Sequence, residues 1–479
     1  MDATALAAAI SAGDLTARDA VERSIATIEQ HNPALGAVVH TRFDEALAEV
    51  EAGLPDGPLH GVPVLIKDLH ADVAGLPSTG GSRLFADHVP EHDSELVRRY
   101  KAAGMVVLGT TNVPEFGLNA STEGALYGPC RNPRALDHST GGSSGGSAVA
   151  VATGMVPVAS ASDGGGSIRI PGSMNGLFGL KPGRGRISPA PYPTLLAGPV
   201  SVQHALTTTV RDSALLFDIT HGSLPGDAFG APTPTRSFVE QVASGPGRRL
   251  RIGLALAPGD GDVAAPEVAA VVRRAADLLS DLGHEVVETT MDYRLEDARA
   301  GGGVLMGAGM VADVQDRLAA LGRELRDDDV EVFTRTLFDH YSATLTGMDV
   351  YRAMCTAQRV GWQLGHQLRG SAGEGAGGVE AGGLDLFLTP TLAEPVPPLG
   401  LLDTSRPESI WQHASRYSAF TSVFNFTGQP AVTVPFGTDS DGLPIGIQLA
   451  ADLGGEGLLL AVAGQIEAAA PWPLRAPGY

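Results

Sequence analysis

The sequence predicts an α/β fold with a largely parallel or mixed β-sheet. Short apolar segments that contain β-branched residues alternate along the chain with segments whose apolar residues recur at helical spacing. The chain of 479 residues is 43% hydrophobic, a proportion typical of a globular protein with a large core. No internal repeat and no sharp change in composition divides it, so we expect one domain over residues 1–479.

The first half of the chain contains the clearest alternation of helices and strands. Apolar residues at helical spacing predict a helix over 4–30, which Pro33 would end. The run "LHGVPVLIKDL" predicts a buried strand over 59–69. The next predicted elements are a helix over 93–104 closed by Gly104, a strand over 105–112, a short helix over 146–154 and a strand over 155–162.

The second half of the chain contains longer irregular and helical stretches. Residues 222–249 are rich in Pro, Gly and Ser, which predicts an extended surface connection. Residues 294–370 are predicted to be mostly helical, and the glycine-rich residues 370–383 to form a surface loop. The remaining predicted elements are an amphipathic helix over 266–283 and strands over 248–256, 284–290, 384–391 and 430–437.

The charge and the cysteine content exclude several classes of protein. A formal net charge of −21 argues against a basic face that binds nucleic acid. The two cysteines, Cys130 and Cys355, form no CxxC pair, so we expect a reduced, cytoplasmic protein without a disulfide framework. The first residues lack the basic region of a signal peptide, and no run approaches the ~18 apolar residues that a membrane span needs.

Several common active-site motifs do not occur in the sequence. The glycine clusters do not fit GxGxxG, no lysine follows a glycine as in a P-loop, and neither HExxH nor SxxK is found. The 13 histidines form no tight cluster of metal ligands, so we expect no metal site. Residues 141–145 match the GxSxG nucleophile elbow, but that elbow follows a strand directly, whereas "RNPRALDHST" predicts a loop.

Three separate positions could together form a site for acyl transfer. Lys67 ends an apolar strand, where burial would lower its pKa until the neutral amine acts as a general base. Ser143 stands among glycines, and Ser167 follows residues 164–166, whose successive N–H groups could form a nest for an oxyanion. Taken singly, these features are more typical of a lysine that reaches solvent, a flexible loop and a glycine turn. Their joint occurrence favours an active site.

The segment "GGSSGGSAVAVATGMVPVASASDGGGSIRIPGSMNGLFGLKP" resembles the signature of the amidase signature family. Further matches are "LTARDAVERSIATIEQHNPALGAVV", "GPLHGVPVLIKDLHADVAGLPSTGGSR", "GTTNVPEFG" and "GLPIGIQL", so the resemblance covers almost the whole chain. It implies that family's fold, a mixed central sheet flanked by helices on both faces. It is weakest over residues 294–383, which we expect to be a variable helical portion that shapes the substrate site.

The same resemblance implies a role for each candidate residue. A Ser–cis-Ser–Lys triad would consist of the nucleophile Ser167, the bridging Ser143 and the catalytic Lys67. The backbone N–H groups expected in the oxyanion hole are those of Gly164, Gly165, Gly166 and Ser167. The residues expected to hold this loop through an ion pair are Asp163 and Arg169, and those expected to line the substrate pocket are Gly117, Leu118 and Asn119.

The reaction that the resemblance implies is hydrolysis of a small-molecule amide through an acyl-enzyme, which requires neither a metal nor an organic cofactor. "DGGGSIRIPGSMNGLFGLKPGRGRIS" resembles the branch that contains 6-aminohexanoate-cyclic-dimer hydrolases and broad amidases. Glutamine-specific members usually carry threonine where Gly164 stands and glutamine where Ile170 stands, so we expect neither glutamine use nor an ammonia-channelling partner.

Other functions stay open at the level of sequence. The same triad could cleave carbamates (urethanes) or esters. A catalytically silent scaffold and a linker or binding module are the other classes, and the intact Lys67, Ser143 and Ser167 with their buried-strand flanks argue against both. The oligomeric state is also open, with a homodimer as one option.

Overall fold

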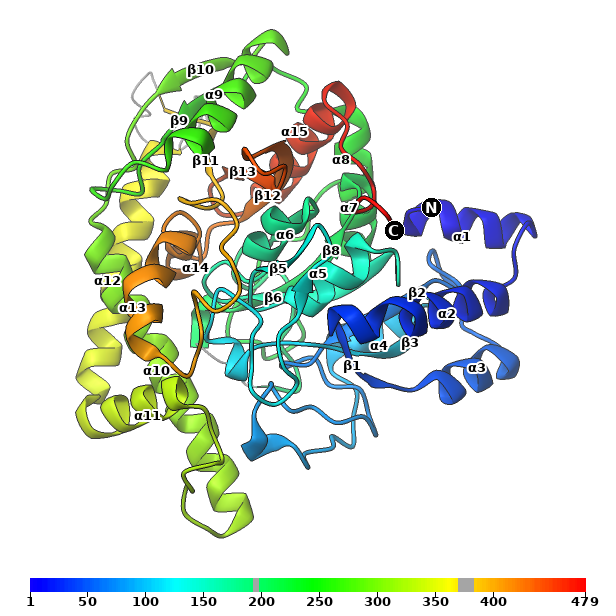
Figure 1. The fold of residues 1–479 in the computed structure, drawn as a ribbon. Coiled ribbons are helices and arrows are strands. Elements are labelled where there is room, and N and C mark those ends of the chain that lie inside the picture. Colours follow the sequence, from blue (N-terminus) through cyan, green and yellow to red (C-terminus); the bar gives the residue numbers. More distant parts are fainter. Residues whose placement is uncertain (193–197, 369–382) are drawn as a thin grey trace.

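Figure 1 shows a large twisted β-sheet surrounded by helices. The computed structural model describes residues 1–192, 198–368 and 383–479. Within these residues, eleven strands form one sheet in the order β1-β3-β2-β6-β8-β7-β12-β13-β11-β9-β10. Parallel pairs (β2 with β3 and β6, β9 with β10 and β11) occur beside antiparallel ones, so the sheet is mixed. The predicted α/β class is therefore confirmed.

The strands of this sheet are short, and most are fully buried in their centre. They are β1 (Val38–Thr41), β2 (Pro63–Lys67), β3 (Val106–Thr111), β6 (Val158–Asp163), β7 (Phe178–Lys181), β8 (Val202–Thr207), β9 (Arg251–Leu254), β10 (Glu285–Glu288), β11 (Leu386–Pro390), β12 (Ala431–Thr438) and β13 (Pro444–Ala450). A separate two-stranded sheet consists of β4 (Arg131–Asn132) and β5 (Ala135–Ser139).

Helices cover both faces of the sheet, because successive residues of a strand point to opposite sides. In β2, Leu65 packs in one apolar cluster, whereas Val64 and Ile66 pack in another. The first cluster includes residues of α2 (Ala17–Leu35), α3 (Phe43–Ala52) and α5 (Gly145–Ala152). The second includes residues of α1 (Ala3–Ala12), α4 (Glu95–Ala102) and α7 (Val210–Thr220).

The second half of the chain builds a larger core around β7 and β9–β13. Helices α9 (Pro266–Asp281) and α15 (Glu456–Ala469) pack in it. The predicted helical stretch forms α10 (Leu295–Leu321), α11 (Val332–Thr344) and α12 (Gly347–Gln367), which lie along the left side of Figure 1. The remaining helices are α6 (Arg169–Asn175), α8 (Phe238–Ser244), α13 (Pro407–Tyr417) and α14 (Ser422–Thr427). Among the described residues, no helix is both long and apolar enough to span a membrane.

The helix predicted over 4–30 is in fact two helices. Helix α1 ends at Gly13 in the left-handed conformation (φ 78°), and Thr16 begins α2 with a capping box that includes Asp19. These local caps outweigh the continuous apolar spacing. Pro33 does not end α2 but lies in its last turn, and the helix closes on Gly36 (φ 64°). A proline there removes one hydrogen bond without preventing that turn from closing.

The other elements differ from the prediction mainly in their ends. The predicted strands and helices exist, but most are shorter, as β2 is compared with 59–69. The connection predicted over 222–249 contains α8, which a second capping box begins at Ser237. The loop predicted over 370–383 lies, except for Gly383, outside the described residues.

Candidate active site

Lys67 is buried at the end of β2, with an exposed fraction of 1%. Its Nζ is hydrogen-bonded to Ser143 Oγ at 2.8 Å and to Ser162 Oγ at 2.9 Å. Its backbone N–H donates to Ser160 Oγ at 2.8 Å, which fixes the strand end beside β6. Burial lowers the pKa of Lys67 to about 7, although the nearby Asp163 carboxylate partly opposes this. A substantial share of the amine is therefore neutral near pH 7 and can accept a proton.

Ser143 lies in the turn between β5 and α5, and the peptide bond between Gly142 and Ser143 is cis. A side chain at Gly142 would meet Asn119 O at 2.5 Å, so only glycine fits there. The preceding segment, predicted as a loop, contains strand β5. This strand pairs with β4 and bridges to Pro398, and it does not belong to the main sheet. Ser143 is also hydrogen-bonded to a lysine, so the GxSxG match still does not correspond to a hydrolase elbow.

Ser167 stands between β6 and α6, at the end of the glycine segment 164–166. Within the described residues, the backbone N–H groups of Gly164, Gly165 and Ser167 have no acceptor. The N–H of Gly166 instead donates to Asp163 Oδ1 at 2.7 Å. Of the four N–H groups expected in an oxyanion hole, that of Gly166 is therefore already engaged, because one N–H cannot serve an internal carboxylate and a substrate at full strength.

Asp163 and Arg169 form the expected ion pair, at 2.9 Å and with both side chains fully buried. Burial alone would raise the pKa of Asp163, but the charge and hydrogen bonds of Arg169, together with Lys181 and Asn425, outweigh burial and lower that pKa to about 2. Arg169 also donates to Thr421 O, Gln448 Oε1 and Asn425 Oδ1. The loop that carries Ser167 is thus held by a paired, fully hydrogen-bonded charge network.

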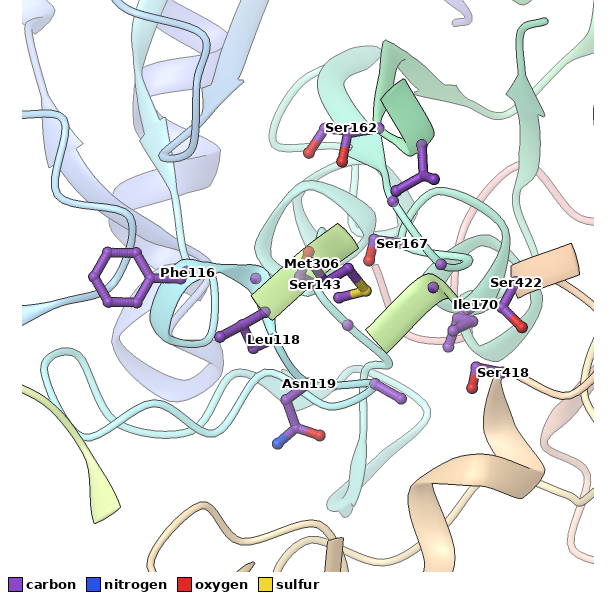
Figure 2. Close-up of a pocket in the computed structure, with 18 of the residues that line it drawn as sticks. Phe116, Leu118, Asn119, Ser143, Ser162, Ser167, Ile170, Met306, Ser418 and Ser422 are labelled. Carbon is purple, nitrogen blue, oxygen red and sulfur yellow. The ribbon is translucent and has the colours of Figure 1, made fainter. Parts of the chain in front are cut away.

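The two serines line one cavity, shown in Figure 2, but no direct hydrogen bond between their hydroxyls occurs in the described residues. Ser162, which sequence reasoning missed, lines the same cavity beside them. The only signal in the sequence was that Ser160 and Ser162 stand two residues apart in the predicted strand, so that both side chains lie on the same face of the sheet. Ser418 and Ser422 line the cavity from a segment about 250 residues further along the chain than Ser167, with Ser422 at the start of α14.

The loop of Gly117, Leu118 and Asn119 lines the cavity as expected. Gly117 has φ 68°, and a side chain on it would meet Ser143 Oγ at 2.9 Å. Glycine at this position therefore keeps space open beside the Ser143 hydroxyl. The Asn119 amide nitrogen donates to Leu402 O at 2.7 Å, so this group holds the loop and is not free for a substrate.

The cavity wall is mainly apolar. Its larger apolar members are Leu69, Phe116, Leu118, Ile170, Val200, Met306 and Phe426. Arg299 and His70 are the only titratable side chains among the described lining residues, and His70 Nε2 lies 3.4 Å from Asp313 Oδ2. The wall therefore suits an uncharged substrate better than a cation, because no lining carboxylate would compensate a buried positive charge.

Comparisons with known proteins agree with this arrangement. A family model described as Amidase matches residues 19–460. The 6-aminohexanoate-cyclic-dimer hydrolase of Paenarthrobacter ureafaciens is 37% identical over 99% of this chain and 96% of its own length. A solved structure of 6-aminohexanoate cyclic dimer hydrolase with substrate superposes with a TM-score of 0.91 at 34% identity, covering 100% of this chain and 98% of that one. A bacterial aryl acylamidase of the amidase signature family superposes with a TM-score of 0.86 at 30% identity, covering 98% and 96%.

The chain therefore belongs to the amidase family and has the amidase signature fold. Its relatives hydrolyse cyclic and linear amides, so this protein is an enzyme that hydrolyses carbon–nitrogen bonds.

Proposed function

We propose that the protein hydrolyses small, uncharged and largely apolar amides through a covalent acyl-enzyme. The observation that carries this proposal is the buried pair of Lys67 Nζ and Ser143 Oγ, 2.8 Å apart, beside the cavity that Ser167 also lines. The pKa of about 7 supports a neutral lysine as the base. A lysine–serine pair can activate a second serine as a histidine does in other hydrolases.

In the proposed acylation, Ser167 Oγ bonds to the substrate carbonyl carbon. Its proton passes to Ser143 Oγ while the Ser143 proton passes to Lys67 Nζ. The free N–H groups of Gly164, Gly165 and Ser167 stabilise the oxyanion; removing one such donor typically costs ~3–4 kcal/mol of the barrier. The carbon–nitrogen bond then breaks, and the leaving nitrogen takes a proton from Ser143 as Lys67 returns its own.

In the proposed deacylation, a water molecule replaces the amine and attacks the ester carbonyl. The relay removes the water proton, and the bond to Ser167 Oγ breaks with return of a proton to that oxygen. The products are a carboxylic acid and an amine or ammonia. The serine hydroxyls need to approach each other for the relay, and this happens when the substrate carbonyl occupies the cavity between them.

We also propose that the portion over 294–383 shapes the substrate site through its helix α10. Ala298, Gly302 and Met306 recur every four residues of this helix and line the cavity. A glycine inside a helix lowers the stability of the helix by about 1 kcal/mol relative to alanine. Each glycine of α10 therefore needs an explanation in packing or function. A side chain at Gly301 would meet the Phe426 ring at 2.3 Å, which explains that glycine by packing.

Gly302 has no such explanation within the chain. Among the described residues, no atom outside its own helix lies within 4 Å of the position that a side chain would take. Its space opens into the cavity, so we propose that it accommodates part of the substrate. One relative is named as a hydrolase of 6-aminohexanoate cyclic dimer. If this chain binds the same compound, the space beside Gly302 would accommodate part of its uncharged ring.

The test is a panel of matched aryl amides, esters and carbamates, measured with the wild type and Ser167→Ala. The proposal predicts amide hydrolysis by the wild type, loss of turnover in Ser167→Ala, and addition of one fluorophosphonate label at Ser167 in the intact mass. Faster cleavage of the carbamates than of the amides would favour a urethane hydrolase instead. Wild-type turnover by Ser167→Ala would reject the assignment of the nucleophile.

The expected cytoplasmic location and the homodimer option stay predictions. Cell fractionation checks the first, and sedimentation of the purified chain checks the second.

A further inference from the structure

The peptide between Gly165 and Gly166 is held on both sides. Thr421 Oγ1 donates to Gly165 O at 2.7 Å, and the N–H of Gly166 donates to Asp163 Oδ1 at 2.7 Å. The C=O and N–H of a trans peptide point in opposite directions, so these two bonds together fix the rotation of the peptide plane. The N–H groups on either side, those of Gly165 and Ser167, are two of the three proposed oxyanion donors.

The position of Thr421 is itself fixed by hydrogen bonds of its own backbone N–H and C=O groups. It stands directly before α14, its N–H donates to Ser418 O at 3.2 Å, and its carbonyl accepts from Arg169 Nη1 at 2.9 Å. Thr421 is fully buried. A side chain at Gly166 would meet Thr421 Oγ1 at 2.4 Å, so the hydroxyl reaches the glycine segment only because glycine stands there.

The start of α14 serves two purposes on adjacent sides. Thr421 and Asn425, four residues apart, bond to the loop that carries Ser167: Asn425 Nδ2 donates to Asp163 O at 2.8 Å and to Asp163 Oδ1 at 2.9 Å. Ser422 and Phe426, also four residues apart, line the cavity. The helix therefore connects the substrate cavity with the oxyanion segment.

We propose that Thr421 is a positioning residue for the oxyanion hole. Its hydroxyl holds the Gly165 carbonyl away from the cavity, which keeps the N–H groups of Gly165 and Ser167 directed at the developing oxyanion. Asp163 alone leaves the carbonyl side of this peptide unrestrained. The inference rests on the proposed acyl-enzyme function.

The experiment compares Thr421→Val, Thr421→Ser and Thr421→Ala in the full chain with an aryl amide substrate. Valine keeps the shape of threonine but cannot donate, so kcat should fall about 10- to 100-fold while KM stays within about twofold. Serine keeps the hydroxyl and should retain most of kcat. The Ser and Ala variants differ only in the hydroxyl. If the Thr421→Val variant does not fold, the comparison of these two variants still tests the proposal.

Two further measurements separate positioning from packing. The rate of fluorophosphonate labelling at Ser167 should fall in parallel with kcat, because that reaction also develops charge on an oxygen. Thr427→Val is the matched control: Thr427 lies on the same helix, is buried, and bonds to Val423 O and Gln429 Oε1 rather than to the glycine segment. It should leave kcat and the labelling rate unchanged.

The inference is overturned if Thr421→Val, or Thr421→Ala where valine does not fold, keeps wild-type kcat and labelling rate. A change in KM alone, or equal losses of kcat in the serine and alanine variants, would also overturn it. Absence of a label at Ser167 in the wild type would instead reject the proposed function. The two failures are therefore distinguishable.

Discussion

Two regions of the cavity differ in how tightly they are packed. Around Lys67 and Ser143, contacts leave little spare room: glycines at 117 and 142 stand where a side chain would meet Ser143 Oγ at 2.9 Å and Asn119 O at 2.5 Å. Elsewhere in the cavity lining, Gly302 of α10 faces open space. The comparison suggests that dense packing fixes the chemistry in this enzyme, and that unfilled volume sets which amide it accepts.

The two regions should therefore respond differently to substitution. Changes in the packed region should abolish or slow the chemical step for every substrate, because they move or remove groups at the reacting atoms. Changes at the α10 wall should alter KM for large substrates and spare small ones.

The largest effect is expected for Lys67→Met. Loss of the base should lower kcat about a thousandfold or more with any amide, since triad members act as a unit. Stopped assays with an aryl amide measure it. Lys101→Met is the control, because Lys101 pairs with Asp93 at 2.7 Å in the first half of the chain and does not line the cavity. A Lys67→Met variant with a kcat near that of the control would contradict the assigned base.

The next effect is expected for Asp163→Asn, which leaves the buried Arg169 without its counter-charge. Breaking a buried ion pair typically costs ~3–5 kcal/mol of the free energy of unfolding, measured here by urea denaturation. The control is Glu456→Gln, which breaks another buried pair, with Arg186 at 3.0 Å. Both should destabilise the chain, but only Asp163→Asn should also lower kcat under conditions where both variants are folded.

The pH dependence should show the base directly. Lys67 must be neutral to accept a proton, so kcat/KM should rise with pH and level off above an apparent pKa near the value of about 7. At one pH unit below that pKa, the rate should be about a tenth of the plateau. The Asp163 carboxylate raises the pKa of Lys67 and so partly offsets burial, which means that folded Asp163→Asn should shift this limb to lower pH. A profile that is flat from pH 5 to 9 would exclude Lys67 as the titrating base.

The smallest and most selective effects are expected at Gly302. Gly302→Leu should raise KM several-fold for amides with a bulky acyl group and leave small acetyl amides unchanged, because leucine fills the open space. Gly302→Ala should stabilise α10 by about 0.5–1 kcal/mol and change kinetics little. Equal losses with large and small substrates after Gly302→Leu would mean that the helix had moved.

Much of the site was predictable from local sequence. Lys67 stands at the end of an apolar strand, and Ser143 and Ser167 stand in glycine clusters that only a few backbone conformations explain. The order of strands and helices was visible because each apolar run is local. The split between α1 and α2 was also encoded locally, in Gly13 and Thr16, but the continuous apolar spacing concealed it.

Other parts of the site were not predictable. Nothing in "FTSVFNFTGQP" indicates that Thr421 and Asn425 form hydrogen bonds to the loop that carries Ser167, more than 250 residues earlier in the chain. The engagement of the Gly166 N–H by the Asp163 carboxylate also depends on where that carboxylate points. Such contacts arise from the packing of distant segments, and residue type and spacing within one segment do not predict them.

The sequence by itself determined the fold class and indicated the catalytic triad and the acyl-enzyme chemistry that we propose, because these depend on patterns within single segments and on a long family motif. Only the tertiary structure decided which N–H groups stay free for an oxyanion, how far burial lowers the pKa of Lys67, and where the cavity is open. Hydrogen-bond direction, desolvation and empty volume are properties of the packed chain, and each depends on atoms contributed by several distant elements.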